Sequence, residues 1–382
     1  MAEAAPSTPT THPPSAMVWL DVGQVELVRA AVGVAGITIT HAGCPEAGKV
    51  REIAAALGCE PADDLRTALA STKAGLVLLA APGGIGSGRG GASEAEIEAL
   101  FACADRGVRV ASLEPMPGSI LHLPQDPSGI DDGAGMGVAI GPEPSEEPIA
   151  GGAASEWATF VPLARLSKPV REAGEILAQL GTMSMVSVQA LCGPGQGSLG
   201  ARMYDAMEMI AWLLGTPDRV DAAYVPPTAN GRGRSVHALP GDSLVGLEGD
   251  LSANLRFADG RAASVVASNR AGRWSRAITV VGEKGRLRFY DDGLDWISPE
   301  GAVLDSSRDA ARVRGSAQQE AAIAPAARVI GDQLARLLDA AGPVDAPTNI
   351  GAVLSMAGAA LLSARTGESE SPETLLRMAR GG

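Results

Sequence analysis

The stretch GLVLLAAP, from Gly75 to Pro82, decides the fold class of this 382-residue chain. Its centre, Leu76 to Ala80, is wholly apolar, and such a run is typical of a β-strand that is covered on both faces, as in a parallel sheet. Short apolar runs alternate with helical periodicity on both sides of it. The predicted strands are 16–20, 36–40, 76–80 and 108–113, and the predicted helices are 24–32, 45–57, 65–70 and 93–106. This order predicts an α/β fold with a Rossmann-like, doubly wound parallel sheet over roughly residues 16–120.

Beyond about residue 230 the hydrophobic pattern changes to a period of two. In Leu251–Phe257 (LSANLRF) every second residue is apolar, which indicates a strand with one buried and one solvated face. The turn signals Asp259-Gly260, Glu283–Gly285 and Asp292-Gly293 separate further strands. We therefore expect an antiparallel meander, and a C-terminal α/β domain built on an open, largely antiparallel sheet.

The predicted organisation has three parts. Residues 1–15 are rich in Pro, Thr and Ser and are expected to be a disordered tail, with Met1 and Met17 both open as the start. Residues 16–123 form the Rossmann-like domain, and residues 124–382 form the second domain. We expect the terminal helices of the second domain to pack back on the first.

Composition excludes several classes of protein. The 31 Lys and Arg against 44 Asp and Glu give a net charge of −13, which argues against a nucleic-acid partner. The four cysteines have neither zinc-site nor disulfide-framework spacing. The longest apolar run is far shorter than the about 18 residues that span a membrane. We expect a cytoplasmic protein with no membrane contact.

Several stretches together carry a resemblance to a known family. They are Ala80-Ala81-Pro82, GVRVASLEPMP at Gly107–Pro117, GSLGARMYDAMEMIAWLLGTPDRVDA at Gly197–Ala222, the strands ANLRFADGRAASV and ITVVGEKGRLRFY, and the tail Ser363–Gly367. In this order and spacing the chain resembles the Gfo/Idh/MocA family of NAD(P)-dependent sugar and cyclitol oxidoreductases. The resemblance implies NAD or NADP as cofactor, and it implies Gly23, Pro82 and Glu114 as cofactor-binding positions.

The dinucleotide fingerprint departs from the family pattern. Gly23 takes the place of its middle glycine, but Asp21 and Glu26 take the flanking places. A carboxylate there would repel a diphosphate, and the Glu26 side chain would block close packing of helix on strand. The second strand, which should end in an acidic residue, offers only His41 nearby. The sequence predicts that cofactor binding is eroded.

The catalytic motifs depart as well. Glu114 is kept, but Pro115 stands where the family places its lysine, and Asp205 stands where it places its acid/base histidine. Asp205 could accept a proton only with a strongly raised pKa. Asp205 and Glu208 lie one helical turn apart, so they could be a general base and its partner, or two ligands of a hard cation. The alternative is a capped or solvated helix start.

The resemblance also implies a substrate region, with Arg202, Arg270, Arg273 and Trp274 as candidates. Arginines around a tryptophan suit a carboxylated or hydroxylated sugar. The alternative is a basic sheet edge that prevents aggregation.

The leading hypothesis is a divergent, non-redox relative that binds a sugar-like ligand or a partner and forms homo-oligomers through its open sheet. One alternative is an active oxidoreductase of a sugar or cyclitol hydroxyl that uses Asp205, supported by Glu114 or Glu208. A second alternative is a metal-assisted lyase or hydrolase.

Overall fold

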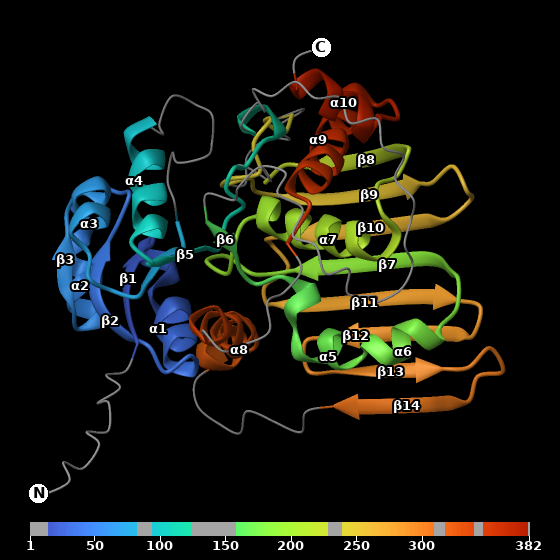
Figure 1. Ribbon diagram of the computed structural model, residues 1–382, viewed down its shortest axis with the longest axis horizontal. Helices are drawn as coiled ribbons and strands as arrows, with labels where there is room; N and C mark the ends of the chain where they lie inside the picture. Colours follow the sequence, from blue (N-terminus) through green and yellow to red (C-terminus); the bar gives the residue numbers. More distant parts are fainter. Residues whose placement is uncertain are drawn as a thin grey trace, which may run out of the picture.

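The structure is a computed structural model, and it describes residues 14–81, 94–123, 158–227, 239–308, 318–339 and 347–380. These residues form two β-sheets with their covering helices, which lie side by side in Figure 1. Three parts of the sequence analysis lie outside the described residues. They are residues 1–13 of the predicted tail, Pro82, and residues 124–157 after the first domain. The domain limits stay a prediction.

The first sheet has six parallel strands in the order β3-β2-β1-β4-β5-β6. Its strands are β1 Ser15–Trp19, β2 Thr38–Gly43, β3 Glu60–Ala62, β4 Leu76–Leu79, β5 Arg109–Ser112 and β6 Thr159–Phe160. Its helices are the 3-10 turn η1 Val22–Gln24, followed by α1 Val25–Val34, α2 Val50–Leu57, α3 Leu65–Ser71 and α4 Glu94–Asp105. This arrangement confirms the doubly wound prediction, although β3 and β6 carry too few residues to be recognised in the sequence.

Burial explains why β4 lies at the centre of this sheet. All four of its side chains, Leu76 to Leu79, are 0% exposed, and they point alternately to the two helical layers. Burying each contributes about 2 kcal/mol. α2 begins five residues later than predicted and ends at Gly58, whose left-handed conformation (φ 70°) provides the C-cap.

The second sheet has eight strands in the order β14-β13-β12-β11-β7-β10-β9-β8. Its strands are β7 Met183–Leu191, β8 Arg219–Val225, β9 Asp250–Arg256, β10 Ala262–Ser268, β11 Ser275–Gly282, β12 Gly285–Tyr290, β13 Gly293–Ile297 and β14 Val303–Arg308. The open, largely antiparallel sheet is confirmed. The uninterrupted meander is wrong, because β7 lies between β10 and β11 and runs parallel to β10. Alternate residues of β7 are buried, so this strand also needs a central position in the sheet. It therefore separates β10 and β11, which are neighbours in the sequence.

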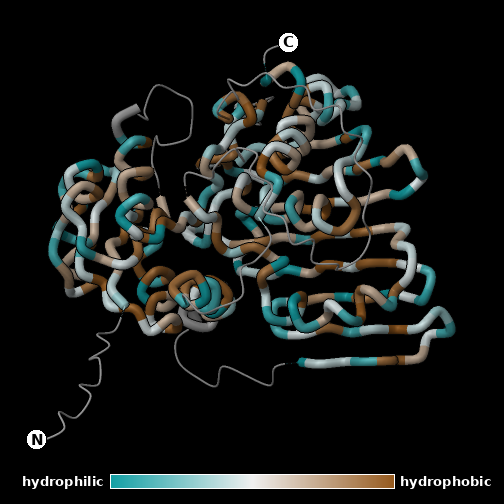
Figure 2. The backbone as a smooth tube through the Cα atoms, viewed as in Figure 1, coloured by the Kyte–Doolittle hydropathy of each residue, from teal (hydrophilic) through white to brown (hydrophobic). Residues whose placement is uncertain are grey.

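Helices cover one face of the second sheet. They are the 3-10 turn η3 Ala164–Leu166, α5 Lys168–Glu172, α6 Gly174–Gln179, α7 Leu199–Leu214, α9 Ile350–Thr366 and α10 Pro372–Ala379, with η2 Ile120–His122 beside the last two. The remaining helix, α8 Gln318–Leu338, packs against α1 of the first sheet (Figure 1). Figure 2 shows hydrophobic residues, in brown, along α8 and along the central strands of the second sheet. No helix in the described part of the chain is long and apolar enough to cross a membrane.

Candidate functional site

The carboxylates of Asp205 and Glu208 are buried near the middle of α7. Asp205 is 0% exposed and Glu208 is 3% exposed. Ser198 is the N-cap of this helix, and its hydroxyl accepts a hydrogen bond from the amide of Ala201 at 2.9 Å. The helix start is therefore capped, as one alternative held, but these two carboxylates are not solvated.

Both oxygens of the Asp205 carboxylate have donors. The amide of Ala164 donates to Oδ1 at 2.6 Å, and Nη1 of Arg276 donates to Oδ2 at 2.9 Å. Nη1 of Arg202 lies 3.9 Å from Oδ2. Asp205 is thus committed to contacts within the chain, with a backbone amide and one close guanidinium.

Glu208 is paired in the same manner. Nε of Arg165 donates to its Oε1 at 2.6 Å. Burial raises the pKa of Glu208 above its ordinary value, and the attraction of Arg165 opposes that rise. The second carboxylate at this place therefore also has a charged partner from the chain.

The ion pairs continue towards the second sheet. Asp291, at the end of β12, accepts from Nε of Arg276 at 2.8 Å and from the indole of Trp274 at 2.7 Å. The guanidinium of Arg202 stacks over the Trp274 ring, 4.0 Å from its centroid. Arg202 is 1% exposed, and its Nε has no hydrogen-bond partner.

These residues make one charge-balanced group, which we call the buried ion-pair cluster. Its members are Arg165, Arg202, Asp205, Glu208, Trp274, Arg276 and Asp291. Burial alone would lower the pKa of Arg276, but Asp205 and Asp291 raise it above its ordinary value. Three cations face three anions, so each charge removed would leave another uncompensated inside the protein.

The segment Leu163–Arg165, which leads into η3, is held by side chains of α7 and α8. Gln333 of α8 donates to the carbonyl of Leu163 at 2.6 Å and accepts from its amide at 2.8 Å. The next two residues of the segment are held by Asp205 and Glu208. Three successive residues are therefore fastened to α8 and α7.

Glu114 follows β5 and meets the start of α7. Its carboxylate, in a residue that is 6% exposed, accepts from the amide of Ser198 at 3.1 Å and from its hydroxyl at 2.5 Å. The amide of Gly246 lies 3.4 Å from Oε2. Burial raises the pKa of Glu114 to about 7, and the Ser198 hydrogen bonds and the Gly246 amide oppose the rise.

The predicted cofactor position, Gly23, lies in η1 at the carboxyl end of β1. β1 and β4 adjoin where the strand order reverses, which is where dinucleotides bind in sheets of this kind. The side chain of Gln24 bridges these two strand ends: it accepts from the amide of Asp21 at 3.0 Å and donates to the carbonyl of Ala80 at 3.0 Å. Pro82, the next predicted position, lies outside the described residues.

A loop from the second sheet comes close to the same turn. Gly195 has a φ of +77°, and a Cβ built on it would lie 2.6 Å from the carbonyl oxygen of Gly23. Burial and the nearby Glu46 raise the pKa of Asp21. Glu26, in contrast, is exposed and pairs with Arg29 at 2.6 Å, so the expectation that it blocks helix packing is wrong.

The predicted substrate residues are divided between two places. Arg202 and Trp274 belong to the buried ion-pair cluster, whereas Arg270 and Arg273 are exposed. Arg270 lies near Pro226 and Asp250, 3.3 Å from the carbonyl of Pro226 and 3.5 Å from Oδ2 of Asp250. Four contributors had no signal in the sequence and emerge only from the structure: Gln24, Arg165, Ser198 and Asp291.

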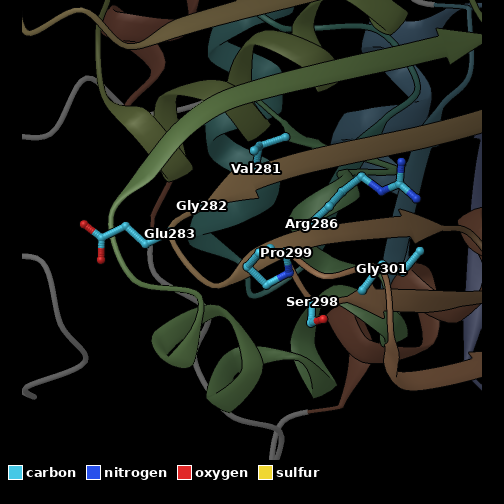
Figure 3. Close-up of a pocket in the computed structure, with 9 residues that line it drawn as sticks. Val281, Gly282, Glu283, Arg286, Ser298, Pro299 and Gly301 are labelled. Carbon is cyan, nitrogen blue, oxygen red and sulfur yellow. The ribbon is translucent and has the colours of Figure 1, made fainter.

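Two further features bear on chemistry. No group of three His, Cys, Asp or Glu that could hold a metal is found among the described residues. A pocket of about 450 Å³ lies at the turn end of β11 and β12, and none of the predicted site residues lines it (Figure 3). Its lining is Val281, Gly282, Glu283, Gly285, Arg286, Ile297, Ser298, Pro299 and Gly301.

Comparison with known proteins was made by sequence and by structure. No protein-family model matches the chain, and no curated protein matches its sequence. Solved structures match along nearly the whole length. A levoglucosan dehydrogenase in complex with NADH and L-sorbose has a TM-score of 0.61 at 13% identity, covering 94% of this chain and 98% of its own.

Two more structures agree with it. An oxidoreductase from Agrobacterium radiobacter, in complex with NAD+, L-tartaric acid and magnesium, has a TM-score of 0.59 at 14% identity and covers 96% of this chain and 100% of its own. A scyllo-inositol dehydrogenase from Lactobacillus casei has a TM-score of 0.55 at 14% identity, covering 94% and 98%. These are oxidoreductases of the Gfo/Idh/MocA type, so the resemblance stated from the sequence is confirmed at the level of the fold.

Proposed function

We propose that this chain is a non-redox protein on a dehydrogenase fold, which binds a sugar-like ligand or a partner and transfers no hydride. The observation that carries the proposal is that both carboxylate oxygens of Asp205 are already hydrogen-bonded within the chain. At the place of the family's acid/base histidine stands a buried carboxylate whose two oxygens accept from Ala164 and Arg276. A base must be free to take a proton from a substrate, and here that step would break a buried ion pair.

The residues at the cofactor crevice also support the proposal. A nicotinamide dinucleotide supplies hydride when bound, but its diphosphate needs backbone amides and open space at the turn after β1. Here Gln24 bridges the strand ends, Gly195 lies against Gly23, and Asp21 adds a carboxylate. The residues present do not fit the group. The family's lysine is lacking too, since Pro115 takes its place and Gly107–Pro117 contains no lysine.

The solved neighbours support the proposed ligand class. Arg202 and Trp274 are buried against each other in the cluster, so the ligand class rests on the neighbours. The solved neighbours hold L-sorbose and L-tartaric acid, which are compounds of that class. We further propose that the protein is cytoplasmic and that its open sheet supports a homo-oligomer.

Calorimetric titration with NAD+, NADH, NADP+ and NADPH tests the proposal. We expect no binding tighter than a Kd of about 1 mM. The carboxylate of Asp21 would repel the diphosphate, and Gln24 bridges the two strand ends where it would lie. The levoglucosan dehydrogenase, titrated in parallel, is the positive control. Micromolar binding of any of the four to this chain would overturn the proposal.

One observation favours the active oxidoreductase as a second candidate. The pKa of Glu114, raised to about 7 by burial, is matched to proton transfer near neutral pH. That candidate predicts reduction of a nicotinamide cofactor by some polyol. The metal-assisted alternative has less support, because Asp205 and Glu208 already pair with arginines; a stoichiometric cation found in the purified protein would revive it.

A further inference from the structure

We propose that the pocket at the turn end of β11 and β12 binds a small aliphatic carboxylate, and that Arg286 holds the carboxylate group. The pocket has a volume of about 450 Å³, which is within the range of ligand pockets in proteins. None of its lining residues belongs to the cofactor crevice or to the buried ion-pair cluster. The proposal therefore concerns a second site, and it does not rest on the function proposed above.

Three strand residues line the pocket side by side on one face of the second sheet. Val281 on β11 pairs with Arg286 on β12, and Arg286 pairs with Ile297 on β13. The chain neighbours Val280 and Leu287 are buried in the core between this sheet and its helices. Because successive side chains of a strand point to opposite faces, the three lining residues lie on the face that the helices leave open.

Arg286 is an exposed cation, and within the described part of the chain its guanidinium has no hydrogen bond or ion pair. Other arginines on the same face are paired. Arg256 contacts Asp221 at 3.0 Å, and Arg308 contacts Asp295 at 2.8 Å. A guanidinium with free N–H groups suits a carboxylate, which accepts two parallel hydrogen bonds from it.

The lining around this cation is largely aliphatic. Val281, Ile297 and Pro299 all contribute apolar surface that is not fully buried. Glu283 is the other charged lining residue, but its side chain points away from Arg286 in Figure 3. The pocket therefore favours an anion with an aliphatic body over a bare anion such as phosphate.

Backbone hydrogen bonds hold both turns that border the pocket. In the turn between β11 and β12, the amide of Glu283 donates to the carbonyl of Thr182 at 3.2 Å. In the turn between β13 and β14, the amide of Ser298 donates to the carbonyl of Ala302 at 2.8 Å. The pocket is therefore preformed, so little conformational entropy is lost when a ligand binds.

A second copy of this chain fits the pocket less well than a small carboxylate. In the described strands, the acidic residues on the open face are Asp221, Asp250 and Asp295, and each already pairs with an arginine of its own chain. A copy that docked face to face would bring no free carboxylate to Arg286. Charge complementarity therefore favours the small ligand at this end of the sheet.

Methyl-resolved NMR of the full-length protein tests the site, with hexanoate as the probe. We expect saturable shifts of the Val281 and Ile297 methyl signals, with a Kd of about 1 mM. Acetate keeps the charge without the chain, and 1-hexanol keeps the chain without the charge. Each should therefore bind at least about 10-fold more weakly than hexanoate.

Arg286→Gln should lower the affinity for hexanoate about 10-fold, because glutamine lacks the charge that holds the carboxylate. Arg288→Gln is the matched control and should leave the affinity unchanged. Arg288 is exposed on the same face of β12, but it stacks over Tyr290 at 4.9 Å and does not line the pocket. The methyl spectra also report whether each variant keeps the fold.

Three results would each overturn the proposal. They are the absence of saturable shifts at about 20 mM hexanoate, equal binding of hexanoate and 1-hexanol, and unchanged affinity in Arg286→Gln. Light scattering provides a fourth test. A molar mass that falls in Arg286→Gln, in a protein without hexanoate shifts, would show that copies of the chain cover this face instead.

Discussion

Asp205→Asn should lower the free energy of unfolding by about 3–5 kcal/mol, because it removes one charge from a buried ion pair. An asparagine can still accept from the Ala164 amide through Oδ1. Its amide group, however, would point donor hydrogens at Nη1 of Arg276, which then keeps only Asp291. Urea unfolding followed by circular dichroism measures the loss.

Asp221→Asn is the control for Asp205→Asn. Asp221 pairs with Arg256 at 3.0 Å, but its side chain is about half exposed and that of Arg256 is exposed, so the change should cost about 0.5 kcal/mol. A loss at Asp205 as small as this would contradict the structural role assigned to the cluster. A different outcome would support the active oxidoreductase. In that case the unmodified protein reduces a nicotinamide cofactor with a polyol, and Asp205→Asn abolishes this activity without lowering the free energy of unfolding.

Gly200→Ala should destabilise the protein by at least about 3 kcal/mol, although alanine is the better helix former by about 1 kcal/mol. Gly200 lies in the first turn of α7, and a Cβ there would be 1.8 Å from the carbonyl oxygen of Leu244. The obstructing atom is backbone, so the turn that holds Gly246 against Glu114 must move. The free energy of unfolding is again the measurement.

Gly33→Ala provides the comparison for this second substitution. Gly33 is also helical, within α1, but a Cβ on it would have no neighbour within 4 Å. It should therefore stabilise the protein by up to about 1 kcal/mol. Equal effects at the two glycines would show that the close approach of Leu244 to α7 is not present in solution.

The sequence predicts the fold well because its signals are local. The apolar run at β4 and the period of two in β9 are each contained in a few residues, and both indicate the correct sheet. The position of β7 was not predictable in this manner. Its pairing with β10 joins residues about 77 apart, and such pairing depends on which strands remain to be buried together.

The site was predictable only in part, for the same reason. The motif comparison places Asp205, Glu208 and Arg202 on one helix, and the structure brings them together. Their partners are distant in sequence: Ala164 is 41 residues from Asp205, and Arg276 is 71 residues from it. Spacing along the chain carries no information about such pairs, so the sequence could not distinguish a free carboxylate from one that is already bound.

The cluster also limits how this chain could evolve. A single Asp205→His change would place an imidazole beside Arg276 and take away the acceptor of the Ala164 amide. A histidine at position 205 would then need a second replacement, at Arg276, before it could be tolerated. Substitutions at these two positions therefore depend on each other, because a single change to histidine at position 205 passes through a less stable intermediate.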